Sequence, residues 1–227
     1  MARPRKFDEA DVLDMAAEAF WTKGFEATST RDLTECTGLT QSSIYAAFGD
    51  KRGLFLRALK HYFDRVLHER IARLEVLRPG QAIGDFFTEV IERSLADPRH
   101  RGCMLVNTAL EATPDDPELQ RYVAQETVMI EDFFKRCIAA GQASGEFPAD
   151  RSAADGARHL LAVLLGLRVL VRVRPDAALL TGLVSPALAT LGLVWPDLGW
   201  LDLAGDDAPR RDRSGQPADT HSPNHPI

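Results

Sequence analysis

A short polar segment, residues 40–45, carries side chains suited to reading DNA. Four of them offer hydrogen-bonding groups without negative charge: Gln41, Ser42, Ser43 and Tyr45. An amide can pair with the edge of a base in the major groove, and hydroxyl groups can bind bases or phosphates. The segment therefore predicts a nucleic-acid contact. The polar outer face of an ordinary helical packing unit is the alternative.

Side chains suited to binding phosphate flank this segment. Thr28, Ser29 and Lys51 stand where helices are predicted to begin, and the free N–H groups at such positions attract anions. The N-terminus carries a basic arm, which can enter a minor groove; an ordinary charged terminus is the alternative. The predicted DNA-binding residues are Arg3, Arg5, Thr28, Ser29, Thr40, Gln41, Ser42, Ser43, Tyr45 and Lys51.

The cysteines do not form a disulfide framework, because Cys36, Cys103 and Cys137 are odd in number and far apart. Cys103 follows Arg101 at the start of a predicted helix, where positive charge favours a thiolate. A redox-sensing thiol is one interpretation of Cys103, and a buried inert thiol is the other. His100 and Cys103 have a metal-compatible spacing but no second pair nearby, so no metal site and no cofactor are expected.

No motif of a known catalytic class is present. The sequence lacks His-Glu-x-x-His, a glycine-rich phosphate loop and Gly-x-Ser-x-Gly. We therefore expect that this protein is not an enzyme.

Composition and charge describe an ordinary globular protein. Of the 227 residues, 45% are apolar and 26% are charged, and the formal net charge is −6. Nine basic residues balance nine acidic ones within residues 1–60, so the negative excess lies in the remainder. No secretory signal is apparent, and the longest apolar run, residues 160–173, is interrupted by Arg168 and Arg172. These features predict a cytoplasmic protein that does not bind membranes.

Almost every segment repeats its apolar residues at helical spacing, so the expected fold class is all-α. Gly38 separates the second and third helices. Because glycine accepts a positive φ, it predicts the tight turn of a helix-turn-helix. Helices are expected over residues 8–23, 30–36, 41–48, 50–77, 81–96, 103–112, 117–144, 150–173 and 177–194.

These elements predict a division of the chain into four parts. Residues 1–50 would form a three-helix helix-turn-helix DNA-binding domain with its basic arm, and residues 51–78 a connecting helix. Residues 79–203 would form a helical ligand-binding and dimerisation domain. Residues 204–227 hold almost nothing apolar, and such a composition predicts a disordered tail.

The ordered string from Phe25 to Phe55, FEATSTRDLTECTGLTQSSIYAAFGDKRGLF, resembles the DNA-binding signature of the TetR family of bacterial transcriptional regulators. The similarity covers about residues 7–60. It implies a homodimer that binds a palindromic operator and is released when a small ligand enters the C-terminal domain.

Position by position, the resemblance implies roles for the polar residues singled out above. Thr28 and Lys51 match the family's usual phosphate contacts, and Thr40 matches the cap of the recognition helix. Gln41, Ser42, Ser43 and Tyr45 match positions that touch DNA. Many members carry a histidine or a second aromatic residue where this chain has Ala46 and Ala47, so base reading would depend more on Gln41 and Tyr45.

The helices 157–173 and 177–194 are apolar on nearly all sides, and such helices must be covered on both flanks. A second copy of the chain is the natural cover, which predicts a four-helix homodimer interface. A monomer that buries both helices internally is the alternative.

A small-molecule pocket is expected inside the helical bundle. Aromatic and apolar residues at helical spacing line cores as well as cavities, whereas polar residues within apolar runs need a partner that a ligand can supply. The candidate lining residues are Phe63, Phe86, Phe87, Val90, Met104, Asn107, Thr108, Met129, Phe133 and His159.

The sequence therefore predicts a transcriptional regulator, foremost a repressor, that binds double-stranded operator DNA as a homodimer and is released by a small-molecule effector. A transcriptional activator and a helical adaptor without DNA affinity are the alternatives. Thiol sensing through Cys103 is a further input.

Overall fold

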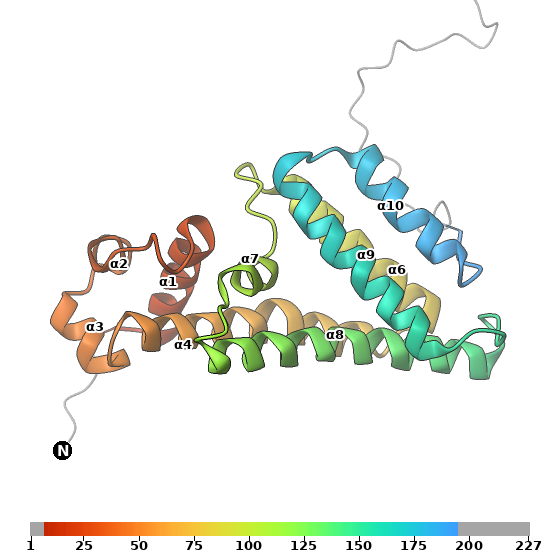
Figure 1. The fold of residues 1–227 in the computed structure, drawn as a ribbon, viewed down its shortest axis with the longest axis horizontal. Helices are drawn as coiled ribbons and strands as arrows, with labels where there is room; N and C mark the ends of the chain where they lie inside the picture. The colour runs from red at the N-terminus through yellow and green to blue at the C-terminus, as the bar shows by residue number, and fades with distance from the viewer. Residues whose placement is uncertain (1–6, 195–227) are drawn as a thin grey trace, which may run out of the picture.

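A computed structural model describes residues 7–194; the predicted arm residues Arg3 and Arg5 and the predicted tail lie outside them. The described residues are helical without a strand, so the all-α class is confirmed (Figure 1). The helices are α1 (Glu9–Lys23), α2 (Thr30–Thr37), α3 (Gln41–Phe48), α4 (Lys51–Phe63), the π-helix η1 (Asp64–His68), α5 (Glu69–Leu74), α6 (Pro79–Ala96), α7 (Met104–Glu111), α8 (Pro117–Ser144), α9 (Ala153–Val173) and α10 (Ala177–Ala189).

Helices α1–α3 form a small N-terminal head on the first turns of α4 (Figure 1). Phe20 of α1 packs edge-on against Phe55 of α4, with ring centroids 5.0 Å apart. Leu33 and Ile44 close this core from α2 and α3, and both are fully buried. The apolar stripes that predicted these helices are therefore their buried faces.

The fourth predicted helix, residues 50–77, is a continuous rod with an irregular middle. Asp50 caps α4 by accepting a hydrogen bond from Gly53 N at 2.7 Å. The rod passes through η1 and ends at Leu74, three residues earlier than predicted. Pro79 does not end this helix but begins α6, because the first turn of a helix does not need the N–H that proline lacks.

Helices α6, α8 and α9 pack around a phenylalanine core. Phe86 and Phe87 of α6 meet Phe133 and Phe134 of α8, with ring centroids between 5.1 and 5.6 Å apart. Helix α8 lies alongside the α4–α5 rod, and α10 lies on the outside of α6 and α9 (Figure 1). The described residues contain no helix long and apolar enough to cross a membrane.

The last predicted helix is too long by five residues, because α10 ends at Ala189 rather than at residue 194. Leu191 N bonds to Leu188 O at 2.9 Å, which tightens the chain into turns, and Gly192 then adopts a positive φ of 75°. Helix α9 begins at Ala153 behind the cap residue Ser152, three residues after the predicted start.

Candidate nucleic-acid interface and sensor cavity

The turn between α2 and α3 has the geometry that its sequence predicts. Gly38 adopts φ 68° and closes α2 with a hydrogen bond from its N–H to Thr34 O at 3.0 Å. Thr37 is buried and donates its hydroxyl hydrogen bond to Leu33 O at 2.6 Å. The two short helices are therefore joined as a helix-turn-helix, whose second helix is the one that reads the groove.

Helix α3 sorts its side chains into two faces. Ile44 and Phe48 are buried against the head core, as their spacing predicts. Gln41, Ser42 and Tyr45 are exposed on the other face, which carries no acidic residue. The Tyr45 hydroxyl lies 3.4 Å from Thr30 Oγ1 of α2, a contact that orients the ring.

Thr40 and Ser43 have local partners at the start of α3. Thr40 Oγ1 accepts a hydrogen bond from Ser43 N at 3.2 Å and lies 2.9 Å from Ser43 Oγ. Ser43 is half-buried. These two hydroxyls therefore stabilise the beginning of the helix.

Ser29 begins α2 through a reciprocal capping box with Asp32. Ser29 N donates to Asp32 Oδ2 at 2.8 Å, and Ser29 Oγ accepts from Asp32 N at 3.1 Å. The hydrogen bond from Lys23, at 2.5 Å, holds the pKa of the Asp32 carboxyl well below its usual range, and the Ser29 bonds act in the same direction. Asp32 is therefore a fixed anion close to the predicted DNA-facing surface.

Thr28 and Lys51 are engaged inside the head. Thr28 is fully buried and donates to Gly24 O at 2.6 Å. The Lys51 ammonium donates to the carbonyls of Phe25 at 2.9 Å, Thr28 at 3.1 Å and Glu26 at 3.4 Å. It also lies 4.4 Å from the centre of the Phe25 ring. In this arrangement the lysine holds the loop before α2 in place, a role that spacing alone did not indicate.

A cavity lies between the rod and helices α6, α7 and α9, and we call it the sensor cavity after the ligand pocket that the sequence predicts. We use this name for two adjoining hollows of about 40 and 110 Å³, whose walls share Tyr62, Val66, Arg70 and Arg168. Of the predicted lining residues, Phe63, Phe86 and Val90 border it. Burial raises the pKa of the Tyr62 phenol above its usual range.

The other predicted lining residues lie elsewhere. Phe87, Met104, Thr108 and Phe133 are buried in the core, and Met129 is half-buried. Asn107 links two chain segments by hydrogen bonds. Its Nδ2 donates to Arg101 O at 3.1 Å, and its Oδ1 accepts from Arg172 Nη1 at 2.9 Å.

His159 is exposed and borders a separate hollow near the end of α8. Its position next to Leu160 suggested burial, but the side chain lies on the outer side of α9.

Cys103 stands immediately before α7 and borders the sensor cavity. It is a free, half-buried thiol, so its burial leaves both interpretations, a redox-sensing and an inert thiol, as predictions. Within residues 7–194 no three His, Cys, Asp or Glu side chains are grouped so that they could hold a metal ion.

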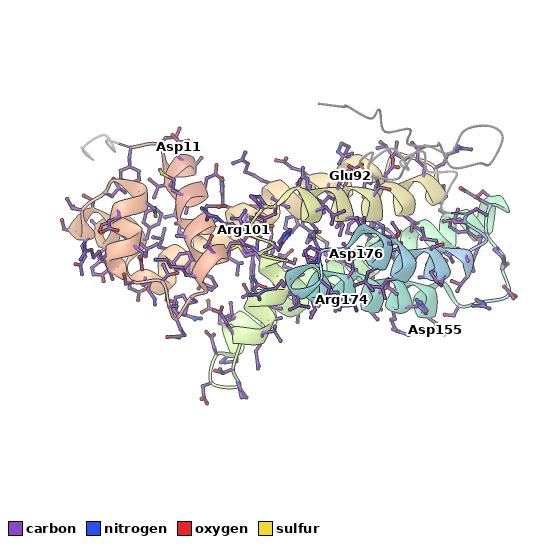
Figure 2. All side chains as sticks on the ribbon, turned by 90° about the horizontal axis from the view of Figure 1, so that it is seen from above. Asp11, Glu92, Arg101, Asp155, Arg174 and Asp176 are labelled. Carbon is purple, nitrogen blue, oxygen red and sulfur yellow. The ribbon has the colours of Figure 1, made fainter. Side chains whose placement is uncertain are left out.

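Contacts between the head and the bundle were not predicted from the sequence. Glu111, at the end of α7, accepts a hydrogen bond from Phe25 N at 2.8 Å. Arg101 packs its guanidinium 4.1 Å from the Trp21 ring centre and pairs with Glu18 of α1. Figure 2 shows Arg101 between the head and the bundle. These contacts join residues more than 75 positions apart in the sequence, so no local sequence pattern predicts them.

A helix-turn-helix head joined to a helical bundle with an internal cavity defines a transcriptional regulator, and the family models agree. One described as "Bacterial regulatory proteins, tetR family" matches residues 12–58, and one described as "Tetracyclin repressor-like, C-terminal domain" matches residues 81–184. The chain belongs to the TetR family of bacterial regulatory proteins. This membership confirms the resemblance and the expectation that the protein is not an enzyme.

Two curated relatives are similar over most of the chain. The uncharacterized HTH-type transcriptional regulator YezE of Bacillus subtilis (strain 168) is 36% identical over 84% of this chain and 100% of its own length. The HTH-type transcriptional repressor ComR of Escherichia coli (strain K12) is 31% identical over 75% of this chain and 82% of its own.

Solved structures share the fold. A cysteine mutant of the TetR family transcriptional regulator CifR, complexed with 26-bp double-strand operator DNA, superposes with a TM-score of 0.75 at 31% identity. The match covers 84% of this chain and 100% of the CifR chain. A TetR transcriptional regulator from Chloroflexus aurantiacus J-10-FL, at 24% identity and a TM-score of 0.72 over 81% of this chain and 93% of its own, shows the fold alone.

Proposed function

We propose that this protein is a cytoplasmic repressor that binds a palindromic operator as a homodimer and is released by a small-molecule effector. The main support is the exposed face of α3, which carries Gln41, Ser42 and Tyr45 and no acidic residue. This face belongs to a helix-turn-helix in a chain of the TetR family. The complex of CifR with operator DNA and the repressor activity in the name of ComR support the DNA partner and the direction of regulation.

In this proposal Gln41 reads a base edge, and Tyr45 and Ser42 contact bases or phosphates. Lys51 and Thr28 act by holding in place the loop before α2, so that the start of α2 can approach a DNA phosphate. Ser29 and Thr40 fix the helix ends, and Arg3 and Arg5 would reach the minor groove from the arm.

The homodimer would form through α9 and α10. Helix α9 buries one side against α8, while Val169 and Val173 on other sides are 47% and 70% exposed. Gly166 and Gly182 have open space around them, so a partner helix could approach closely. A two-fold dimer would place two recognition helices on paired half-sites.

Selection of genomic DNA fragments by the full-length protein tests the assignment. We expect one enriched palindrome, bound with an affinity that falls steeply with salt. Gln41→Ala should weaken binding to that palindrome by about tenfold, because a bidentate base contact contributes about 1–3 kcal/mol.

Gln120→Ala is the matched control, since Gln120 is an exposed glutamine on α8. Equal operator affinity in both variants would contradict the assigned reading face. Enrichment of no sequence at all would favour the adaptor alternative. A reporter gene placed behind the palindrome separates repression from activation.

A further inference from the structure

Two residues that border the sensor cavity carry buried hydrogen-bond donors without acceptors. The Arg70 side chain is 4% exposed, and its Nη2 has no hydrogen-bond partner within the described residues. Trp21 borders the larger hollow, and its Nε1 is also buried without a partner within the described residues. Because an indole N–H and a guanidinium N–H can only donate, the group that satisfies them must bring acceptor oxygens.

The cavity wall also carries an excess of positive charge. Arg70, Arg93 and Arg168 all border it. Arg168 donates to Ser94 Oγ at 2.9 Å, and neither it nor Arg93 has an ion pair among residues 7–194. Burial, together with the positive charges of Arg168 and Arg93, lowers the pKa of Arg70 to about 10.

The carboxylates nearby are already neutralised. Glu89 pairs with Arg70 at 3.2 Å and also with Arg73 at 2.6 Å. Asp97, the carboxylate on the cavity wall, is bound by Arg101 Nε at 3.0 Å and by the backbone N–H of Arg101 at 2.9 Å. Arg70 is buried, Arg168 is half-buried and Arg93 is exposed, and together they outnumber the free carboxylates at the cavity. A cluster of this composition can bind an anion from outside.

The smaller hollow has a mostly apolar wall, and the two hollows together set the size of the ligand. Phe63, Phe86, Val90 and Leu164 border the smaller hollow. The volumes of the two hollows, about 40 and 110 Å³, together come near the roughly 150 Å³ that holds a benzene-sized molecule.

We propose that the effector is a small organic monoacid. Its carboxylate would bind Arg70, Arg168 and the Trp21 N–H, and its aromatic or short aliphatic body would extend through both hollows and against the apolar side chains of the smaller one. This inference names the ligand class of the proposed function and rests on that function only for the release of DNA.

The position of the cavity links the ligand to the head. Trp21 belongs to α1 of the head, whereas Arg70 and Arg168 belong to the rod and to α9. A carboxylate that draws these donors together would favour one position of the head relative to the bundle. A ligand that binds one position more tightly shifts the population toward it.

Calorimetric titration of the full-length protein tests the site. The probes are benzoate, phenylacetate and hexanoate, each beside its neutral amide, and sodium sulfate as an inorganic anion. We expect at least one acid to bind at one site per chain and about tenfold or more tighter than its amide, as a charge-assisted contact requires. The proposal is overturned if no acid exceeds its amide, or if sulfate binds as tightly as the best acid.

Matched arginine pairs locate the binding. Arg168→Met should weaken acid binding about tenfold or more, whereas Arg172→Met, one turn further along α9, should not. Arg70→Met and Arg73→Met form a second pair, because both arginines bind Glu89 but only Arg70 borders the cavity. Equal effects within both pairs would overturn the site.

Operator binding is measured separately. An acid that binds at this site but leaves operator affinity unchanged overturns its role as effector. Failure of the protein to bind any DNA contradicts the proposed function, and the calorimetric comparison still decides the site.

Discussion

In the proposed function Lys51 acts by holding the loop before α2 in place. Its ammonium donates to three carbonyls of the loop before α2 and lies over the Phe25 ring. That loop leads into the capping box of Ser29 and is also held by Glu111. The lysine thus connects the start of α4 with the start of α2, and its removal should affect folding as well as recognition.

We expect Lys51→Met to lower the free energy of unfolding by about 1–3 kcal/mol, because carbonyls that lose a charged donor are left unsatisfied. Operator affinity should fall together with stability. Lys60→Met is the control, since Lys60 is an exposed lysine on the same helix. Urea unfolding followed by circular dichroism measures the stability of the two variants. A Lys51 variant as stable as wild type would show that the carbonyl contacts contribute little.

Among the elements, the turn between α2 and α3 fixes the direction of the recognition helix. Gly38 holds φ 68° with open space around it, so an added side chain meets backbone strain but no clash. Gly53 differs, because a Cβ there would collide with the carbonyl of Phe48. The first glycine is required by conformation and the second by the close approach of α3 and α4.

Gly38→Ala should cost about 1–2 kcal/mol of stability, since left-handed backbone is unfavourable for alanine. Gly145→Ala is the matched variant, with φ 79° and open space at the end of α8. Both should lose similar stability in thermal unfolding, but only Gly38→Ala should weaken operator binding in fluorescence anisotropy. A parallel loss of operator affinity in both would mean that stability, and not turn geometry, limits binding.

For the whole molecule, the decisive feature is how the head is attached to the bundle. Arg52 of α4 pairs with Asp116 at 2.9 Å and with Glu118 at 2.9 Å, both at the start of α8. Glu111 and Arg101 add contacts from α7 and from the loop before it. If the proposed effector releases DNA, these few polar contacts between head and bundle are where the head position would change.

The Arg52 guanidinium, by its hydrogen bond, holds the pKa of the Asp116 carboxyl below its usual range, and the Leu119 N–H adds to this. A lowered pKa in the folded state stabilises the fold above the ordinary pKa of aspartate, about 4, and this contribution is lost as the pH falls below it. Asp116→Asn should therefore cost up to about 1 kcal/mol at pH 7, and the difference from wild type should vanish toward about pH 3.

Asparagine still caps a helix, so the substitution removes the charge and keeps the cap. Asp176→Asn is the control, because Asp176 caps α10 by accepting from Leu179 N at 2.7 Å and has no ion pair in the described part of the chain. Unfolding of the three proteins at several pH values measures the effect. If Asp116→Asn is less stable than wild type by the same amount at every pH, the loss of stability comes from the helix cap and not from the ion pair.

Assembly is tested on the outer side of α9. Val169→Glu should dissociate the proposed dimer, because a carboxylate buried in an apolar interface is costly. Val128→Glu introduces the same charge at a similarly exposed valine of α8, 53% against 47%, and should leave the dimer intact. Sedimentation velocity distinguishes the outcomes, and a Val169→Glu protein that stays dimeric would place the interface elsewhere.

The sequence by itself determined the all-α class, the helix-turn-helix and the family. These depend on local signals: apolar spacing, the capping residues Ser29 and Asp50, and the turn at Gly38. The tertiary structure decided what depends on distant residues. It buried Thr28 and engaged Lys51 inside the head, and it left His159 exposed. It also brought Trp21, Arg70 and Arg168 to one cavity, because only the packing of helices can bring residues nearly 150 positions apart to the same hollow.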